Sequence, residues 1–325
     1  MPSRFAIPVP ADYVFRRDVC SYGYFLLAPN VWDPRALTLT RPLELEGGVA
    51  SLVIAQPEGR KGSALAAVSD RGLSRRERGE AVRLLTRMLQ LDDESVEAFH
   101  RVDPRWKRSG RGRLFRSPTF FEDLVKTVTS CNVAWPSTIG MNRRLCETIN
   151  PAFPSARQMA RKRPATLRAR CGVGYRDQRL VDLARMVVTG TIDAAWFEDP
   201  ANDDETVYRA LLELPGIGPY AAANVMQLLG RYSRLALDSE SVRHGRTVLG
   251  LEGSEREVMR RLAAHYESFG DQRFRSYWFE VWDWYESRRG KAWTWDPFTT
   301  GKTFTASKLG ESGASAKPAV RGGRR

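Results

Sequence analysis

Aromatic and aliphatic residues between positions 273 and 289 recur every three or four residues, which is the spacing of one face of an α-helix. Gly290 follows the last of them, and glycine commonly terminates helices. The pattern therefore predicts a long helix over residues 273–289. The apolar positions that carry this prediction are Phe274, Tyr277, Trp278, Val281, Trp282 and Tyr285.

Helical patterns dominate the chain from Ser117 onward. Ser117 and Pro118 suit the N-cap and the first position of a helix, respectively. Trp135 and Pro136 open a second predicted helix, and residues 176–188 form a third.

The first part of the chain has a different pattern, with short runs rich in apolar and β-branched residues separated by turn residues. A helical pattern over Ser74–Leu91 follows these runs. We therefore expect an antiparallel sheet covered by one helix. The predicted strands are Tyr22–Leu27, Ala36–Leu39, Val49–Ile54 and Leu65–Val68.

Together these patterns predict an α+β fold divided into three regions. Residues 1–112 form the predicted sheet-and-helix domain, which ends at a glycine-containing junction. Residues 113–298 form a mostly α-helical domain. Residues 299–325 are rich in Gly, Ser, Ala, Lys and Arg with little to bury, which predicts a disordered basic tail.

Charge points to a polyanionic partner. The 325 residues include 51 Lys and Arg against 38 Asp and Glu, which gives a formal net charge of +13. A surplus of this size favours polyanions, among which nucleic acid is the common choice for a soluble protein. The basic tail contributes to the surplus, so charge alone does not establish a nucleic-acid site.

The cysteine pattern gives no indication of a metal centre. Cys20, Cys131, Cys146 and Cys171 lie far apart and form no CxxC pair, so neither a zinc site nor an iron–sulfur cluster is predicted. No apolar run approaches about 18 residues, and the N-terminus lacks a signal-peptide pattern. We expect a protein with no membrane partner that is not secreted and resides in the cytoplasm or nucleoid, or in the nucleus of a eukaryote.

A glycine-containing turn separates two helical patterns near position 216. Pro215 and Gly216 end the first helix, and Gly218 can adopt a positive φ or allow another backbone to approach closely. Pro219 suits the first position of the second helix, whose free N–H groups then face the turn and suit an anion such as a DNA phosphate. An ordinary αα-hairpin has the same pattern. The turn comprises Leu214, Pro215, Gly216, Ile217 and Gly218.

A lone carboxylate, Asp238, follows this turn by about twenty residues. The arrangement resembles the helix-hairpin-helix DNA glycosylases, whose catalytic Asp follows the hairpin at this spacing. Further segments resemble 8-oxoguanine glycosylases and, more closely, a little-characterised plant and bacterial branch of the superfamily. The resemblance covers about residues 115–290 and implies a helical glycosylase core, a small N-terminal sheet domain and double-stranded DNA with a damaged base as partner. The matching segments are residues 131–146 (CNVAWPSTIGMNRRLC), 171–176 (CGVGYR), 238–244 (DSESVRH) and 277–285 (YWFEVWDWY).

Asp238 suits the chemistry of base release. A base leaves deoxyribose most easily when C1′ acquires oxocarbenium character, and a nearby carboxylate can stabilise that charge and orient or activate a water. Asp238 follows an apolar run, Leu235–Leu237, where a low dielectric would strengthen the effect. The alternative is that Asp238 only N-caps the helix that begins near Ser239, and the two roles are compatible.

Tyr220 occupies the position at which bifunctional relatives carry a lysine that forms a Schiff base with the sugar. A phenol cannot form an imine. We therefore expect a monofunctional glycosylase that needs no cofactor and leaves an abasic site. The alternatives are a non-catalytic DNA-binding protein that retains the hairpin, and a bifunctional 8-oxoguanine glycosylase/lyase.

The resemblance also implies residues that open the duplex and read its bases. Asn132 would fill the vacated stack, Tyr175 would act as a wedge, and Arg176 would face the opposite base. Tyr175 could instead be a packing residue at the start of a helix.

The damaged base would lie against the last long helix. Tyr277, Glu280 and Trp284 share one face of that helix, with Trp284 stacking on the base and Glu280 accepting a hydrogen bond from it. Tyr220 and Asn224 could reach the same pocket. An aromatic stripe is also typical of a protein core, and Trp278 and Trp282 are the stronger core candidates.

Two further contacts with DNA are expected. Arg243 and His244 could touch phosphates near the lesion, or could be solvent-facing helix residues. Relatives often bind an alkali ion through hairpin carbonyls, which here would be those of Leu214, Gly216 or Ile217. A monomer is the default for a protein that wraps one lesion.

Overall fold

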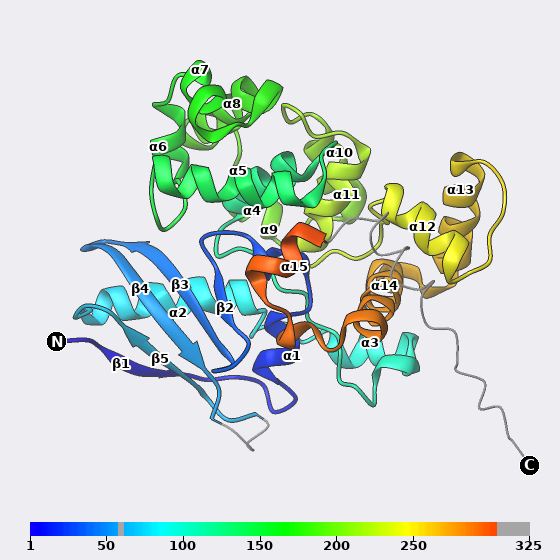
Figure 1. Cartoon of the computed structure of the whole chain (residues 1–325), viewed down its shortest axis with the longest axis horizontal. Helices are drawn as coiled ribbons and strands as arrows, with labels where there is room; N and C mark the ends of the chain where they lie inside the picture. Colours follow the sequence, from blue (N-terminus) through cyan, green and yellow to red (C-terminus); the bar gives the residue numbers. More distant parts are fainter. Residues whose placement is uncertain (58–61, 304–325) are drawn as a thin grey trace, which may run out of the picture.

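Within the described part of the chain, residues 1–57 and 62–303, five strands form one antiparallel sheet near the N-terminus (Figure 1). This computed structural model places the strands in the order β1-β5-β4-β3-β2, so β1 pairs with β5 at one edge. The strands are β1 (Arg4–Ile7), β2 (Val31–Asp33), β3 (Thr38–Leu45), β4 (Gly48–Ala55) and β5 (Leu65–Ser69).

One face of this sheet is buried. Along β4, Leu52 and Ile54 are fully buried whereas Val53 between them is exposed, which is the alternation expected of a strand with one covered face. The helix α2 (Arg75–Leu89) packs on the buried side, and its first turn is closed by a capping box that starts at Ser74. The predicted sheet with a covering helix is present.

Two of the expected strands differ from the structure. Tyr22–Leu27 is not a strand but surrounds the 3₁₀-helix η1 (Gly23–Leu26), and every residue of the segment is buried. Strand propensity is a weak guide in a segment that is covered on all sides. The predicted strand Ala36–Leu39 overlaps only the first residues of β3, and the sequence did not reveal the short edge strands β1 and β2.

The rest of the described chain is mostly helical (Figure 1). No helix in residues 1–57 and 62–303 is long and apolar enough to cross a membrane. Besides α2, the helices are α1 (Phe15–Val19), α3 (Val96–Val102), α4 (Phe120–Ser130), α5 (Trp135–Thr148), α6 (Ala156–Ala160), α7 (Pro164–Thr166), α8 (Asp177–Val188), α9 (Ala194–Glu198), α10 (Asp204–Leu212), α11 (Pro219–Leu228), α12 (Ser239–Thr247), α13 (Glu255–Tyr266), α14 (Arg273–Arg289) and α15 (Pro297–Thr303), together with the single-turn elements η2 (Pro104–Trp106), η3 (Leu167–Cys171), η4 (Gly174–Arg176), η5 (Glu267–Gln272) and η6 (Ala292–Thr294).

Helix α14 has the bounds expected from its apolar spacing, and Gly290 after it has a φ of 76°. Helix α4 begins two residues later than expected, because Thr119 rather than Ser117 caps it by accepting the amide of Glu122. Helix α15 includes residues 299–303 of the region expected to be a disordered tail, and residues 304–325 lie outside the described residues.

Two hydrophobic cores form, and α14 ties the ends of the chain together. One core contains the sheet, α2 and α14, and the other contains α4, α5, α8, α10 and α11. The indole N–H groups of Trp278 and Trp282 donate to the backbone carbonyls of Ser21 and Cys20 at 2.9 and 3.0 Å. The long C-terminal helix therefore packs on the N-terminal segment rather than on the helices that immediately precede it in sequence.

A buried ion pair joins the sheet to α4. Arg41 on β3 donates two hydrogen bonds to the carboxylate of Glu122, at 2.9 and 2.6 Å, and Lys126 lies 2.7 Å from the same carboxylate. Burial alone would raise the pKa of Glu122, but the two cations hold it below its usual value. The pairing fixes the sheet against the helix that borders the site described below.

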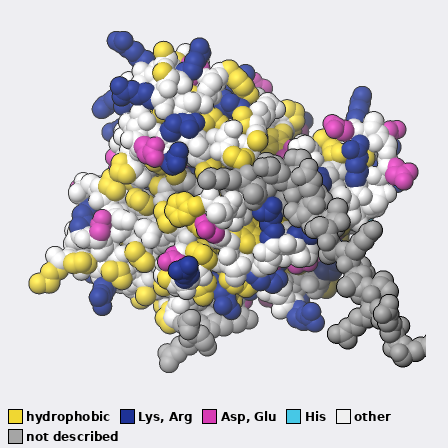
Figure 2. All heavy atoms as spheres, in the orientation of Figure 1, with side chains coloured by type: hydrophobic (Ala, Val, Ile, Leu, Met, Phe, Trp, Pro, Cys, Tyr) yellow, Lys and Arg dark blue, Asp and Glu magenta, His cyan; other side chains and the backbone are white. Residues whose placement is uncertain are grey.

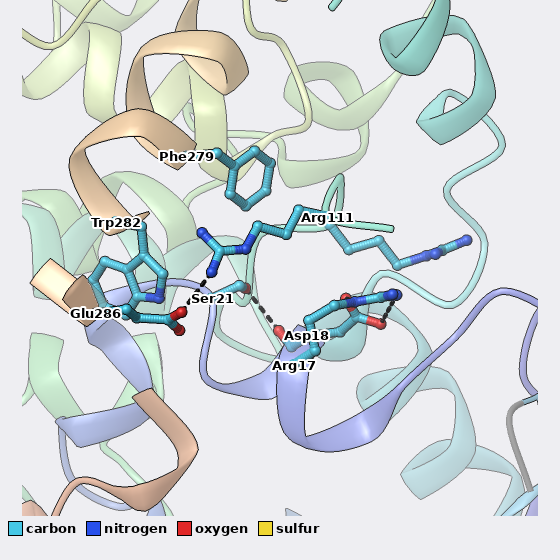
Figure 3. A pocket seen from close by; sticks show the side chains of 8 residues that line it. Arg17, Asp18, Ser21, Arg111, Phe279, Trp282 and Glu286 are labelled. Atoms are coloured by element: carbon cyan, nitrogen blue, oxygen red, sulfur yellow. Dashed lines mark hydrogen bonds and ion pairs between the residues drawn. The ribbon is translucent and has the colours of Figure 1, made fainter. Parts of the chain in front are cut away.

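A second cluster of charges joins α14 to the N-terminal segment (Figure 3). Arg111 reaches Glu286 on α14 at 2.5 Å, while Arg17 pairs with Asp18 at 2.8 Å and the Ser21 hydroxyl donates to the Asp18 carbonyl. The cavity between these side chains is only about 10 Å³, about the space of one water, so it cannot hold a nucleobase.

Candidate functional site

The two helices of the predicted hairpin, α10 and α11, pack against each other, and their connecting turn is closed by a hydrogen bond from the Ile217 amide to the Leu214 carbonyl at 3.0 Å. Pro219 is the first residue of α11, as expected. Gly216, with φ of 80°, takes the left-handed backbone that the turn needs. Gly218 does not: its φ is −95°, and a β-carbon there would meet nothing within 4 Å. The open space at Gly218 leaves the N-terminal amides of α11 accessible from the turn.

Asp238 is the N-cap of α12. Its Oδ1 accepts the amides of Glu240 and Ser241 at 2.9 and 3.1 Å, and the Tyr220 phenol also bonds to the carboxylate. None of these partners is a cation. Burial raises the pKa of Asp238 above its usual value, although the hydrogen bonds from Ser241, Glu240 and Tyr220 act in the opposite direction. The capping role considered from the sequence is therefore present, and it leaves the carboxylate without a salt bridge.

A cavity of about 1000 Å³ opens between the hairpin, α4, α12 and α14, and Asp238 lies on its wall. Its volume is in the range of binding sites for small organic groups, and aromatic side chains supply much of the wall. Sequence-predicted residues that the cavity brings together are Asn132, Tyr175, Arg176, Gly216, Gly218, Tyr220, Asn224, Asp238 and Tyr277.

Asn224 anchors a buried polar network on one side of this cavity. Its Oδ1 accepts the hydroxyl of Tyr22 at 2.6 Å, and its Nδ2 donates to Thr127 at 2.9 Å and to Tyr24 at 3.4 Å. These bonds fix the amide and hold the two tyrosine rings beside the cavity. Asn224 thus lines the pocket as expected, and its amide is already engaged with protein groups.

Asn132 and Tyr175 lie together at the cavity rim. The Asn132 amide donates to the Tyr175 hydroxyl at 3.5 Å, and Asn132 has a φ of 53°, a conformation that Asn tolerates better than most residues. Tyr175 is 52 % exposed, which is unusual for a large aromatic ring. An exposed ring paired with an amide at the mouth of a cavity has the placement that a wedge into DNA requires.

Arg176 does not have the role expected of it. Its side chain is 4 % exposed and donates to the carbonyls of Val128 at 3.1 Å and of Cys131 at the end of α4. It therefore satisfies carbonyls of a helix C-terminus and cannot face an opposite base. The exposed arginine at this rim is Arg179, whose guanidinium lies 5.1 Å from the centre of the Tyr175 ring.

Glu280 and Trp284 do not line the cavity. Glu280 pairs with Arg105 at 2.8 Å, and Trp284 lies beneath the guanidinium of Arg243 at 3.7 Å from the ring centre. Both belong to the face of α14 that turns toward η2 and α12. The assignment from helical spacing chose a face with the right residue types but the wrong direction, and only Tyr277 of that trio borders the cavity.

Arg243 and His244 are not available to DNA phosphates. Arg243 is buried and pairs with Glu240, while His244 is fully buried and its Nε2 lies 2.9 Å from the Tyr266 hydroxyl. Burial lowers the pKa of His244 to about 3, so this ring is neutral at physiological pH. These residues hold α12 against α13 and α14.

Other residues on the wall were missed or assigned to the core. Trp278 and Trp282, read from the sequence as core residues, also border the cavity, as do Tyr22, Trp135 and Glu240. Gly23 makes room for one of these rings, because a β-carbon there would approach Trp135 Cζ2 to 3.1 Å. The sequence offered no signal for Tyr22 or Trp135 beyond the presence of aromatic residues, since tertiary packing brings them to the site.

Basic side chains gather on one lobe of the molecule. Figure 2 shows Lys and Arg concentrated over the α6–α8 end, where exposed arginines include Arg157, Arg161, Arg163, Arg168 and Arg170. This lobe also carries η4 with Tyr175 and the start of α8 with Arg179. A positive surface therefore adjoins the rim of the cavity.

No group of three His, Cys, Asp or Glu side chains in the described part of the chain is placed to hold a metal ion. The four cysteines are free thiols in the structure. Among the residues that line the cavity in this part of the chain there is no lysine. The chemistry that the site offers is that of a carboxylate in an aromatic cavity beside a helix-hairpin-helix turn.

No protein-family model and no curated protein matches the chain, but solved structures do. The 3-methyladenine DNA glycosylase of Archaeoglobus fulgidus is 19 % identical with a TM-score of 0.64, covering 86 % of this chain and 98 % of that one. MBOgg1, solved with a low-affinity DNA ligand, is 16 % identical with a TM-score of 0.63, covering 86 % and 94 %.

The 8-oxoguanine glycosylase/lyase of Clostridium acetobutylicum, in complex with double-stranded DNA, is 16 % identical with a TM-score of 0.60 and covers 86 % of this chain and 96 % of that one. The match in each case spans the sheet as well as the helices. The predicted resemblance is therefore confirmed at the level of architecture: the chain has the α+β fold of the 3-methyladenine and 8-oxoguanine DNA glycosylases.

Proposed function

We propose that the protein is a DNA glycosylase that hydrolyses the N-glycosidic bond of a damaged purine, oxidised or alkylated, flipped out of double-stranded DNA. One observation carries the proposal: the helix-hairpin-helix turn and Asp238 border the same aromatic cavity of about 1000 Å³. A phosphate held at the turn and a base held in the cavity then belong to one strand. The Clostridium neighbour was solved on a DNA duplex, which supports the same partner here.

The rim residues open the duplex. Tyr175, exposed and supported by Asn132, enters the stack beside the lesion while the damaged nucleotide rotates into the cavity. The accessible amides at the start of α11 and the guanidinium of Arg179 hold the phosphate backbone without reading its sequence.

Asp238 acts on the sugar. As the glycosidic bond breaks, its electron pair leaves with the base and C1′ becomes positive, and the carboxylate of Asp238 stabilises that charge. Water adds to C1′ and gives up its proton to this carboxylate. The hydrogen bonds from Ser241, Glu240 and Tyr220 keep the carboxylate in one orientation.

The reaction ends at an abasic site. Tyr220 occupies the place of the imine-forming lysine, its phenol bonds to Asp238, and the described wall of the cavity contains no lysine. These features support a monofunctional glycosylase over a bifunctional glycosylase/lyase.

The protein needs no cofactor for this reaction, and an alkali ion at the hairpin would serve only to bridge to a phosphate. The Leu214 carbonyl accepts the Ile217 amide, but a carbonyl oxygen has a second lone pair, so an ion shared with the Gly216 and Ile217 carbonyls is compatible with the turn. We place the protein, as a monomer, with the DNA of the cell.

A panel of duplexes tests the function. Each duplex carries one damaged base and is incubated with the protein, then heated with alkali to cleave abasic sites. Strand cleavage that appears only after alkali supports a monofunctional glycosylase, and cleavage before alkali supports the bifunctional alternative. DNA binding without base release from any duplex supports the non-catalytic alternative.

A further inference from the structure

The wall of the cavity carries a second carboxylate that the proposed reaction does not use. Glu240, two residues after Asp238, lines the same cavity, and its side chain is 17 % exposed. Burial raises the pKa of Glu240, and Asp238 raises it further, while Arg243 and the Tyr285 phenol lower it. Two acidic groups therefore share one partly desolvated space.

A chain of contacts holds Glu240 in this position. Arg243 pairs with Glu240, donates to the Thr247 hydroxyl at 3.0 Å, and stacks 3.7 Å above the centre of the Trp284 ring. Arg243 thus braces Glu240 from the side away from the cavity, since neither Arg243 nor Trp284 borders it.

The remaining wall is rich in electron-dense rings. Along α14, Phe274, Trp278 and Trp282 stack at 6.1 and 5.4 Å, and Tyr22 lies 4.7 Å from Trp278. The faces of such rings attract cations, and the attraction grows when water is excluded. Tyr220, Tyr277 and Trp135 add further rings to the same wall.

The positive groups of this wall lie elsewhere. Arg176 is occupied by backbone carbonyls at the end of α4, and Arg179 is exposed at the rim beside Tyr175. The cavity therefore separates charge, with cations where the DNA backbone passes and carboxylates and rings where a base enters.

We propose that this cavity selects a damaged base that carries a formal positive charge, as an N-alkylated purine does, and that Glu240 is the residue that determines this selection. The inference rests on the proposed function and narrows its substrate to one class. A neutral oxidised purine gains nothing from the two carboxylates and less from the rings.

The test compares two lesions of guanine in one duplex sequence. One duplex carries 7-methylguanine, which is cationic, on a 2′-fluoro sugar that blocks base loss, and the other carries neutral 8-oxoguanine on the same sugar. Dissociation constants are measured by fluorescence anisotropy at fixed salt. We expect the wild-type protein to bind the cationic lesion at least tenfold more tightly.

The variant Glu240→Gln should remove most of that preference while changing affinity for the 8-oxoguanine duplex less than twofold. Glu280→Gln is the matched control, because it also removes a carboxylate from an ion pair with arginine but lies outside the cavity. Trp278→Leu should reduce the same preference through the rings. Melting temperatures verify that each variant is folded.

Base release from ordinary deoxyribose duplexes separates this inference from the function beneath it. Release of 7-methylguanine but not 8-oxoguanine supports both. Release of 8-oxoguanine together with equal or weaker binding of the cationic duplex overturns the inference and leaves the glycosylase intact. Release of no base from any duplex overturns the proposed function.

Discussion

Arg179 lies across Gly216 so closely that a β-carbon at position 216 would come within 2.6 Å of Arg179 Cδ. The hairpin turn between α10 and α11 is thus in contact with the start of α8, which carries the rim of the cavity. An exposed guanidinium and a set of free helix amides face the same strand of DNA from neighbouring elements.

The first prediction concerns Arg179→Gln. Loss of one phosphate contact should weaken DNA binding and reduce the slope of log affinity against log salt by about 0.9. Arg185→Gln is the control, since Arg185 lies on the same helix, is partly exposed and pairs only weakly with Asp182 at 3.6 Å. Equal salt slopes for the two variants would show that Arg179 does not contact the backbone.

The second prediction concerns Gly216→Ala. The left-handed φ of 80° and the close approach of Arg179 both oppose a side chain here. We expect a loss of about 1–3 kcal/mol in the free energy of unfolding, as for strain at one special backbone position. Gly218→Ala, which has neither constraint, should cost less than about 1 kcal/mol. Urea unfolding of both variants measures the difference, and equal losses would contradict the geometry.

The third prediction concerns pH. Burial raises the pKa of Asp238, so the fraction of ionised carboxylate, and with it kcat/KM for base release, should fall as pH is lowered at a pH above the ordinary value of 3.8. Because the folded protein favours the neutral form, ionisation of Asp238 lowers stability as pH rises through the raised pKa.

Asp238→Asn removes that cost and keeps a good N-cap, so its melting temperature at pH 7 should equal or exceed that of the wild type. A marked loss of stability at pH 7 would assign Asp238 to structure instead of catalysis.

The fourth prediction concerns His244. Its ring is neutral above about pH 3 and bonds to the Tyr266 hydroxyl at 2.9 Å, so His244→Ala should lose about 2–4 kcal/mol of unfolding free energy through the unpaired hydroxyl and the cavity left behind. The salt slope of DNA binding should stay unchanged. A reduced slope with intact stability would restore His244 as a phosphate contact.

How much of this site the sequence could predict differs from residue to residue. Gly216, Pro219 and Asp238 were found because their roles depend on local backbone chemistry, which a short sequence expresses. The bounds of α14 were correct for the same reason, since apolar spacing and Gly290 define a helix end. The face that α14 turns to the cavity was not, because a helix covered all round leaves no polar face to orient it.

Arg176 and Arg179 show the same limit. The sequence places both near Tyr175, and only tertiary structure shows that the first is buried against the end of α4 and the second is exposed. Likewise Tyr22–Leu27 is buried on every side, so its lack of alternation hid the turn of η1 and the approach of Tyr22 to Asn224.

The most direct test of the account is single-turnover base release by Asp238→Asn on a duplex whose damaged base the wild-type protein removes. With DNA affinity and melting temperature kept close to the wild type, the rate should fall on the order of 10³-fold, the range for loss of a charge-stabilising or general-base group. A variant that releases the base within about tenfold of the wild-type rate would contradict the role of Asp238, and with it the mechanism built on this cavity.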